Sequence, residues 1–182
     1  MEANLKGIEK KIGITFKNKD LLQQAFVHRS YLNENKGFHL EHNERLEFLG
    51  DACLELIVTD YLYSNFPNPE GELTNWRAAL VRGAMISQIA KKLGYEDYLL
   101  LSRGEAKSTG RARELILANT FEAVLGAVYL DRGYKSADKL VKKFLIPRLP
   151  EILDKKLYND AKSMFQEIVQ EKTGITPIYK LE

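Results

Sequence analysis

Four acidic side chains recur at spacings of three, four and four residues, which is the spacing of one face of a helix. They are Glu44, Glu47, Asp51 and Glu55. Like charges at these spacings repel each other, and burial raises the free-energy cost of any charge that stays unpaired. We therefore expect a compensating cation, either a distant basic side chain or a divalent metal, because Arg45 points away from this stripe.

A second acidic position is Glu122, three residues after Asn119 in the otherwise apolar run 115–125. A single acid inside a core helix suggests that Glu122 faces the same pocket as the acidic stripe. Carboxylate oxygens with few histidines nearby favour Mg²⁺ or Mn²⁺ over zinc. Spacing alone leaves two interpretations open, a metal site and an acidic seam that is solvated or paired with arginine.

Acidic residues are concentrated in one part of a chain that is otherwise basic. The whole chain has a formal charge of +2, but residues 44–72 contain seven acids and one base. The remainder of the chain is therefore strongly basic. A metal site that serves an anionic substrate would have this pattern, although a solvated acidic face would have it too.

Other candidate sites have weaker support. His39 and His42 have helical spacing but no cysteine or third histidine nearby, so we expect surface residues. His28 is expected to cap or bridge helices, and the single cysteine, Cys53, is expected to be a small buried hydrophobe. The chain has no nucleophile elbow, no P-loop and no dinucleotide glycine pattern, which argues against acyl transfer and against a nucleotide cofactor.

Apolar residues recur with a helical period almost everywhere, so the sequence predicts an all-α fold. Residues 102–113 are interpreted as a basic loop and residues 149–159 as a linker with little to bury. A helix over 160–172 and an extended segment over 178–181 should follow. The helices are predicted at residues 5–11, 19–31, 41–65, 72–81, 83–92, 95–100, 112–131, 135–146 and 160–172.

Length and composition indicate one globular domain with a small appendage. The chain has 182 residues, of which 45% are hydrophobic and 29% are charged. The apolar run 123–130 is far shorter than the roughly 20 residues of a membrane-spanning helix. The first eleven residues lack the apolar core of a secretory signal. We therefore expect a cytoplasmic protein with no membrane partner.

Residues 42–51, HNERLEFLGD, resemble the signature of the ribonuclease III family. Segments 12–31, 69–81 and 115–131 are similar to further parts of its nuclease domain. This resemblance predicts a helical endonuclease domain over residues 1–155. It also predicts that residues 156–182 are a linker and an incomplete double-stranded-RNA-binding domain, which keeps only the first helix and strand of the α-β-β-β-α fold.

The resemblance implies a homodimer that cuts double-stranded RNA with Mg²⁺, for which Mn²⁺ can substitute, in the processing of rRNA and mRNA. The cut would leave 5′-phosphate and 3′-hydroxyl ends. Phe48 would sit at the dimer interface, and Lys107, Arg111 and Gln166 would contact RNA. Glu44 and Glu70 would line the cleft. The metal-ligand positions are Glu47, Asp51, Asn119 and Glu122, of which Asp51 and Glu122 would be catalytic.

The family has aspartate at the position of Asn119, so this chain departs from the pattern at one metal ligand. Asparagine keeps a neutral oxygen but loses a charge, which weakens the hold on a hard cation. We expect an inactivated or weakened variant of a working nuclease. The alternative is a non-catalytic double-stranded-RNA-binding or scaffold protein with the same fold.

Overall fold

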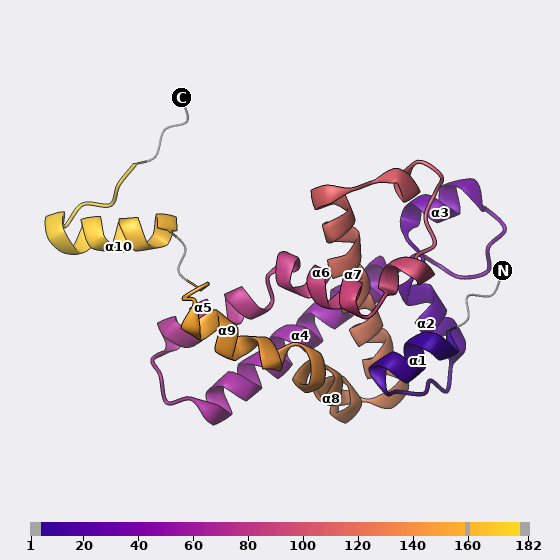
Figure 1. Cartoon of the computed structure of the whole chain (residues 1–182), viewed down its shortest axis with the longest axis horizontal. Helices are drawn as coiled ribbons and strands as arrows, with labels where there is room; N and C mark the ends of the chain where they lie inside the picture. The colour runs from indigo at the N-terminus through magenta and orange to yellow at the C-terminus, as the bar shows by residue number, and fades with distance from the viewer. Residues whose placement is uncertain (1–4, 159–160, 179–182) are drawn as a thin grey trace.

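The computed structural model describes residues 5–158 and 161–178, and within these residues it contains helices and no β-strand (Figure 1). The predicted all-α fold is confirmed. The α-helices are α1 (Lys6–Ile12), α2 (Lys19–Ala25), α3 (Arg29–Glu34), α4 (Glu44–Asn65), α5 (Glu70–Leu80), α6 (Gly83–Lys92), α7 (Gly110–Arg132), α8 (Tyr134–Phe144), α9 (Leu149–Asp154) and α10 (Ala161–Thr173). Three short 3₁₀ helices complete the fold, η1 (Tyr95–Tyr98), η2 (Glu105–Lys107) and η3 (Ile146–Arg148).

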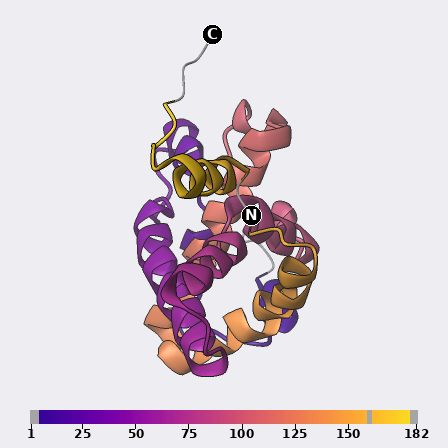
Figure 2. The same cartoon turned by 90° about the vertical axis from the view of Figure 1, so that its left-hand side faces the viewer.

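Helices α4 and α7 are the longest and form the most extensive contact between elements (Figure 1). α7 is buried over most of its length, because α2, α6 and α8 pack around it as well. The view turned by 90° shows α4 at the left of the molecule and α9 at its right (Figure 2). The acidic stripe of α4 and the acid of α7 therefore sit on the two helices whose relative position the core determines most tightly.

Two glycines allow α4 and α7 to approach at backbone distance. A Cβ atom built on Gly50 would overlap the backbone carbonyl of Glu122, and one built on Gly126 would overlap the carbonyl of Leu46. Glycine inside a helix lowers its stability by roughly 0.5–1 kcal/mol relative to alanine, so it needs a packing reason. The reason here is the close approach, which brings the middle of the acidic stripe to the level of Glu122.

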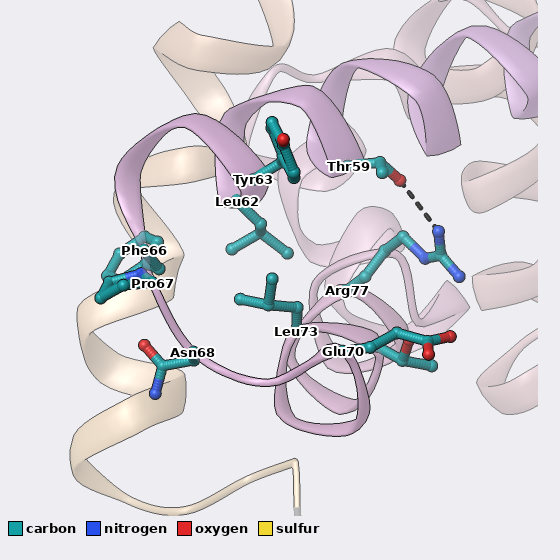
Figure 3. Close-up of a pocket in the computed structure, with 10 residues that line it drawn as sticks. Thr59, Leu62, Tyr63, Phe66, Pro67, Asn68, Glu70, Leu73 and Arg77 are labelled. Carbon is teal, nitrogen blue, oxygen red and sulfur yellow. Dashed lines mark hydrogen bonds between the residues drawn. The ribbon is translucent and has the colours of Figure 1, made fainter.

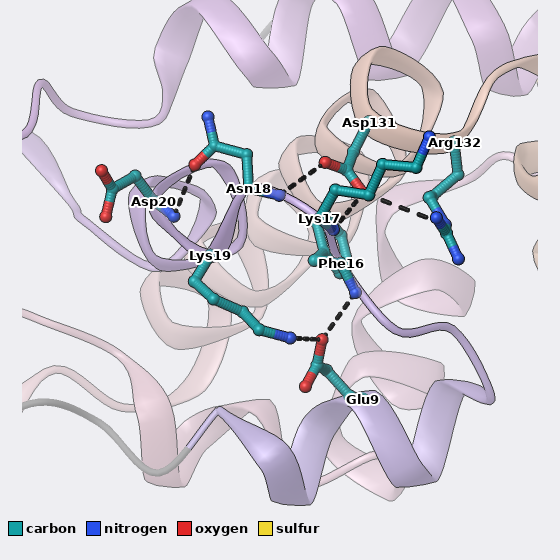
Figure 4. A network of polar contacts seen from close by, with 8 residues as sticks. All are labelled: Glu9, Phe16, Lys17, Asn18, Lys19, Asp20, Asp131 and Arg132. Atoms are coloured by element: carbon teal, nitrogen blue, oxygen red, sulfur yellow. Dashed lines mark hydrogen bonds and ion pairs between the residues drawn. The ribbon is translucent and has the colours of Figure 1, made fainter.

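The carboxyl end of α7 is tied to the start of α2 by Asp131. Its carboxylate accepts hydrogen bonds from the backbone N–H groups of Lys17 and Asn18, both at 2.8 Å (Figure 4). Next to it, the buried carboxylate of Glu9 pairs with Lys19 and accepts the backbone N–H of Phe16 at 2.6 Å. The contacts of Asp131 join α7 to the segment before α2, and those of Glu9 join α1 to the same segment.

Some predicted boundaries were wrong because long-range contacts override helical periodicity. The predicted helix 19–31 is divided into α2 and α3, since Phe26 and His28 exchange backbone hydrogen bonds with Leu100 at 2.9 and 3.0 Å. The expected loop 102–113 contains η2 and the first turn of α7. Likewise, the expected linker 149–159 begins with α9, whose Leu149 and Ile152 are buried.

The end of the chain follows the prediction only in part. α10 occupies most of the helix predicted over 160–172. Ile178 is not in a strand, and the rest of the predicted extended segment, residues 179–181, lies outside the described residues. No helix in the described part of the chain is long and apolar enough to span a membrane.

Candidate active site

The two ends of the acidic stripe are neutralised by distant basic residues. Arg29, at the start of α3, lies 3.3 Å from Glu44, and Arg77 of α5 donates to Glu55 at 3.0 Å. Arg77 also donates to the hydroxyl of Thr59 at 2.9 Å (Figure 3). The sequence left open whether a base or a metal compensates the stripe, and for these two carboxylates the structure provides a base.

The middle of the stripe has no such partner. Within residues 5–158 and 161–178, no ion pair involves Glu47, Asp51 or Glu122. Asp51 is exposed, whereas Glu47 and Glu122 are partly buried. Burial and the neighbouring charges of Glu44 and Asp51 raise the pKa of Glu47, and a hydrogen bond from the side chain of Asn119 opposes them. Asn119 of α7 therefore adjoins Glu47 of the stripe.

Glu122 has the strongest perturbation among these acids. Burial, followed by repulsion from Asp51, Glu47 and Glu55, raises its pKa to about 8. A carboxyl group in this environment is largely protonated at pH 7 unless a cation replaces the proton. Positive charge brought beside Glu122 would therefore favour its ionised form at neutral pH.

The donor set fits a hard divalent cation, although the side chains do not form a finished cage. No three His, Cys, Asp or Glu side chains converge on one point in the part of the chain that the structure describes. Three carboxylates and an amide nonetheless offer the oxygen ligands that Mg²⁺ and Mn²⁺ prefer. Glu47 and Glu122 have flexible side chains, so rotation about their side-chain bonds can direct their oxygens toward a shared cation.

The other predicted site residues lie apart from this group. Glu70 begins α5 and lines a cavity of about 600 Å³ with the end of α4, rather than the space beside Asp51 (Figure 3). Phe48 is 80% exposed on α4. Lys107 in η2 and Arg111 in α7 are exposed, while Gln166 of α10 is partly exposed. Their predicted roles in the cleft, in dimerisation and in RNA binding stay predictions.

The histidine and cysteine predictions have mixed outcomes. His28 caps α3, because its ring nitrogen accepts the backbone N–H of Ser30. Cys53 is buried, as expected. His39 is exposed, but His42 is only one-third exposed, with its Nδ1 atom 3.8 Å from Glu44. Although the sequence of α4 is apolar on nearly every side of the acidic stripe, the helix is not fully buried, since Phe48 and Leu56 are exposed.

Sequence reasoning missed Gly50 and Gly126, the residues that bring the two acidic helices together. A signal was present, because each glycine interrupts an apolar helix that has no other reason to contain one. It also missed Arg29 and Arg77, whose pairing with the stripe depends on the packing of α3 and α5 and leaves no trace in local spacing.

Known proteins are similar in sequence to this chain over most of its length. Residues 18–149 match the family model described as Ribonuclease-III-like. The chain belongs to the ribonuclease III family. It is 46% identical to Ribonuclease 3 of Treponema denticola over 96% of this chain and 71% of that protein. Ribonuclease 3 of Enterococcus faecalis is 43% identical over 96% of this chain and 76% of its own length.

A solved structure supports the same assignment. The nuclease domain of ribonuclease III from Campylobacter jejuni superposes with a TM-score of 0.73 at 35% identity and covers 81% of this chain and 99% of that one. The description of that structure refers to a region of its nuclease domain that is involved in dimer formation.

Proposed function

We propose that this chain is a double-stranded-RNA endoribonuclease of the ribonuclease III family whose divalent-metal site is weakened by Asn119. One observation carries the proposal: in the part of the chain that the structure describes, Glu47, Asp51 and Glu122 adjoin one another without a basic partner, while Glu44 and Glu55 both have one. An unpaired cluster next to paired neighbours is the arrangement expected where a cation belongs.

Glu47, Asp51, Glu122 and the amide oxygen of Asn119 are the groups that would hold this cation, and Mg²⁺ fits their chemistry. A bound divalent metal supplies a Lewis acid for the scissile phosphate and lowers the pKa of a coordinated water. The products would carry 5′-phosphate and 3′-hydroxyl ends. Glu122, with its pKa of about 8, must give up its proton to serve as a ligand, so metal affinity should rise with pH.

Asn119 reduces the charge of this site. Its side chain donates a hydrogen bond that favours the ionised form of Glu47, whereas an aspartate there would add a negative charge beside both glutamates. That charge would strengthen retention of a hard cation. The present chain should therefore cleave duplex RNA weakly or not at all with Mg²⁺, and Mn²⁺ should support more activity because it tolerates imperfect ligand sets better.

RNA recognition would use basic residues outside the acidic cluster. Double-stranded RNA hides its bases in a deep and narrow groove, so proteins recognise its A-form shape, phosphates and 2′-hydroxyls. Lys107 and Arg111 are exposed near the start of α7 and would contact phosphates, and Gln166 on α10 would contact the minor groove. Binding should weaken as salt rises, because each phosphate contact releases a counterion.

We further propose that the nuclease domain forms a homodimer through α4. Phe48 and Tyr63 are each 80% exposed and Leu56 is 57% exposed, and their spacing places all three on one face of the helix. Leu56 lies midway between the other two. A two-fold axis through it would set Phe48 of one copy against Tyr63 and the adjoining 600 Å³ cavity of the other.

The dimer proposal is tested by sedimentation at micromolar concentration. The native chain, with a mass of 20.8 kDa, should sediment at about twice that mass, and Phe48→Glu should be monomeric because it places a charge in the interface. Leu157→Glu, at an exposed apolar residue outside α4, should remain dimeric. A native chain that is monomeric at these concentrations contradicts the proposal.

The nuclease proposal is tested by Asn119→Asp. This variant should gain Mg²⁺-dependent cleavage of a long duplex RNA under conditions in which the native chain shows little, and Glu122→Gln added to it should abolish the gain. Asn119→Leu, which provides no oxygen ligand, serves as the control and should be inactive with both Mg²⁺ and Mn²⁺. If Asn119→Asp folds and dimerises but cleaves no duplex with either metal, the scaffold interpretation becomes the better one.

A further inference from the structure

The segment that follows α9 stays packed against the nuclease domain as far as Tyr158. Leu149 and Ile152 of α9 are buried against the core. After α9 the backbone turns back, because the N–H of Leu157 donates to the carbonyl of Ile152 at 3.0 Å and Lys156 adopts a positive φ of 50°. A non-glycine residue in this region is uncommon and needs support from surrounding contacts.

That support comes from an aromatic row that ends at Tyr158. The rings of Phe66 and Trp76 have centroids 5.3 Å apart, and those of Trp76 and Tyr158 have centroids 6.3 Å apart, both edge to face. Trp76 is only 7% exposed, and Tyr158 is partly buried against the same core. By contrast, Leu157, directly before Tyr158, is 42% exposed.

The helix that contacts Tyr158 also lines the 600 Å³ cavity at the end of α4. α5 begins at Glu70, is joined to α4 through Arg77 and Glu55, and carries Trp76 on its buried side. α5 therefore contacts both Glu55 of the acidic stripe and the segment that follows α9.

We propose that Tyr158 is an anchor that fixes on α5 the point at which the chain leaves the nuclease domain. The ring of Tyr158 packs against Trp76, and the turn at Lys156 directs the ring toward α5. Tyr158 acts through position and touches no substrate, so it is a positioning residue. Its role is to shorten the tether of the segment that begins with α10.

The length of the tether gives the size of the effect. From Tyr158 to Ala161, the first residue of α10, three residues can span at most roughly 10 Å. If the ring is released, the tether starts at Asp154, the last residue of α9, and its seven residues can span roughly 25 Å. The volume open to α10 then grows roughly fifteenfold, which lowers its effective concentration by a similar factor at any point within reach of the short tether.

The anchor does not depend on the proposed RNA cleavage. A failure of the anchor proposal can therefore be distinguished from a failure of the proposed nuclease function, since the following measurements use neither RNA nor metal. Trp76 is the single tryptophan of the chain, so its fluorescence reports directly on the anchor.

The experiment compares the native chain with Tyr158→Ala, Tyr158→Phe and Leu157→Ala. Tyr158→Ala should shift the emission of Trp76 to the red and increase its quenching by acrylamide, because water reaches the exposed indole. Trypsin should cut after Lys155 and Lys156 roughly tenfold faster, since cleavage follows the population of the opened segment. Tyr158→Phe keeps the edge-to-face contact and should behave as native, and so should Leu157→Ala.

Tether length is measured by time-resolved energy transfer from Trp76 to an acceptor on a cysteine introduced at Glu171 of α10. The native Cys53 is buried, so labelling is selective. Tyr158→Ala should broaden the distribution of distances, and Tyr158→Phe should restore the native width. The proposal is overturned if Tyr158→Ala leaves emission, tryptic rates and distances unchanged, or if Leu157→Ala changes them as strongly as Tyr158→Ala.

Discussion

Replacement of Gly126 by alanine should separate the two helices that carry the acidic groups. A Cβ atom at position 126 would lie 3.1 Å from the backbone nitrogen of Gly50 and from the carbonyl carbon of Leu46, and would overlap the oxygen of that carbonyl. All of these neighbours are backbone atoms of α4, so no side-chain rotation relieves the overlap. The helices must move apart by roughly 1 Å to restore ordinary contact in a close-packed interior.

The cost of this displacement opposes the gain in stability that alanine usually gives over glycine in a helix. Removing a helical glycine stabilises by roughly 0.5–1 kcal/mol, whereas overpacking a core costs typically about 1–3 kcal/mol. We therefore expect Gly126→Ala to lower the free energy of unfolding by about 1–2 kcal/mol in guanidinium titrations. Gly83→Ala is the matched control. Its Cβ would meet only the Cβ of Ala118 at 3.9 Å, so this variant should be as stable as the native chain or slightly more stable.

The rate of RNA cleavage gives a second measurement of the separation of α4 and α7. Glu122 is one helical turn from Gly126, so a shift of roughly 1 Å changes its distance from Glu47 and Asp51. In the Asn119→Asp chain, where cleavage is expected, Gly126→Ala should lower the rate by about 100-fold, the usual effect of such a misplacement. The reasoning is refuted if Gly126→Ala is as stable as Gly83→Ala and leaves this rate unchanged.

Two further predictions concern buried acids. The folded protein holds the pKa of Glu122 at about 8, above the ordinary 4.5. Without metal, the free energy of unfolding of the protein should therefore fall as pH rises from about 4.5 to 8. In urea titrations with EDTA, Glu122→Gln should remove on the order of 2 kcal/mol of that loss. A pH profile that Glu122→Gln does not flatten would contradict this. For Glu9, burial raises the pKa, but hydrogen bonds from Lys19 and Phe16 outweigh it and lower the net pKa. Its stabilisation should therefore be present above pH 4.5 and lost as pH falls through the lowered pKa. Glu9→Gln should destabilise the protein by about 1–3 kcal/mol at pH 7 and by less in acid, and an equal loss at both pH values would exclude the ion pair as the cause.

The sequence alone determined the helical class and the acidic stripe. Helical periodicity and the spacing of Glu44, Glu47, Asp51 and Glu55 are local properties, and a local pattern is read correctly when the element is long, as in α4 and α7. The same spacing could not say which carboxylates are paired. That depends on Arg29 and Arg77, which reach the stripe from α3 and α5.

Tertiary structure also decided where local periodicity gives way. The break between α2 and α3 exists because Phe26 and His28 pair with Leu100, more than seventy residues away in sequence, and such pairing outweighs the small free-energy preference of each residue for helix. The polar composition of residues 149–159 predicts a linker with little to bury. Leu149 and Ile152 are nevertheless buried, because α9 packs against α5 and the core.

The candidate site shows the same division between sequence and structure. Residue types alone predicted oxygen ligands for a hard cation. Whether Glu122 meets Glu47 and Asp51 depends on a backbone approach of α4 and α7 that only Gly50 and Gly126 permit. Distance and burial then set the protonation of Glu122, since the repulsion between carboxylates grows as the helices close and water leaves. Composition and spacing contain no measure of that distance, and so the electrostatic character of the site was decided by the packing of two helices.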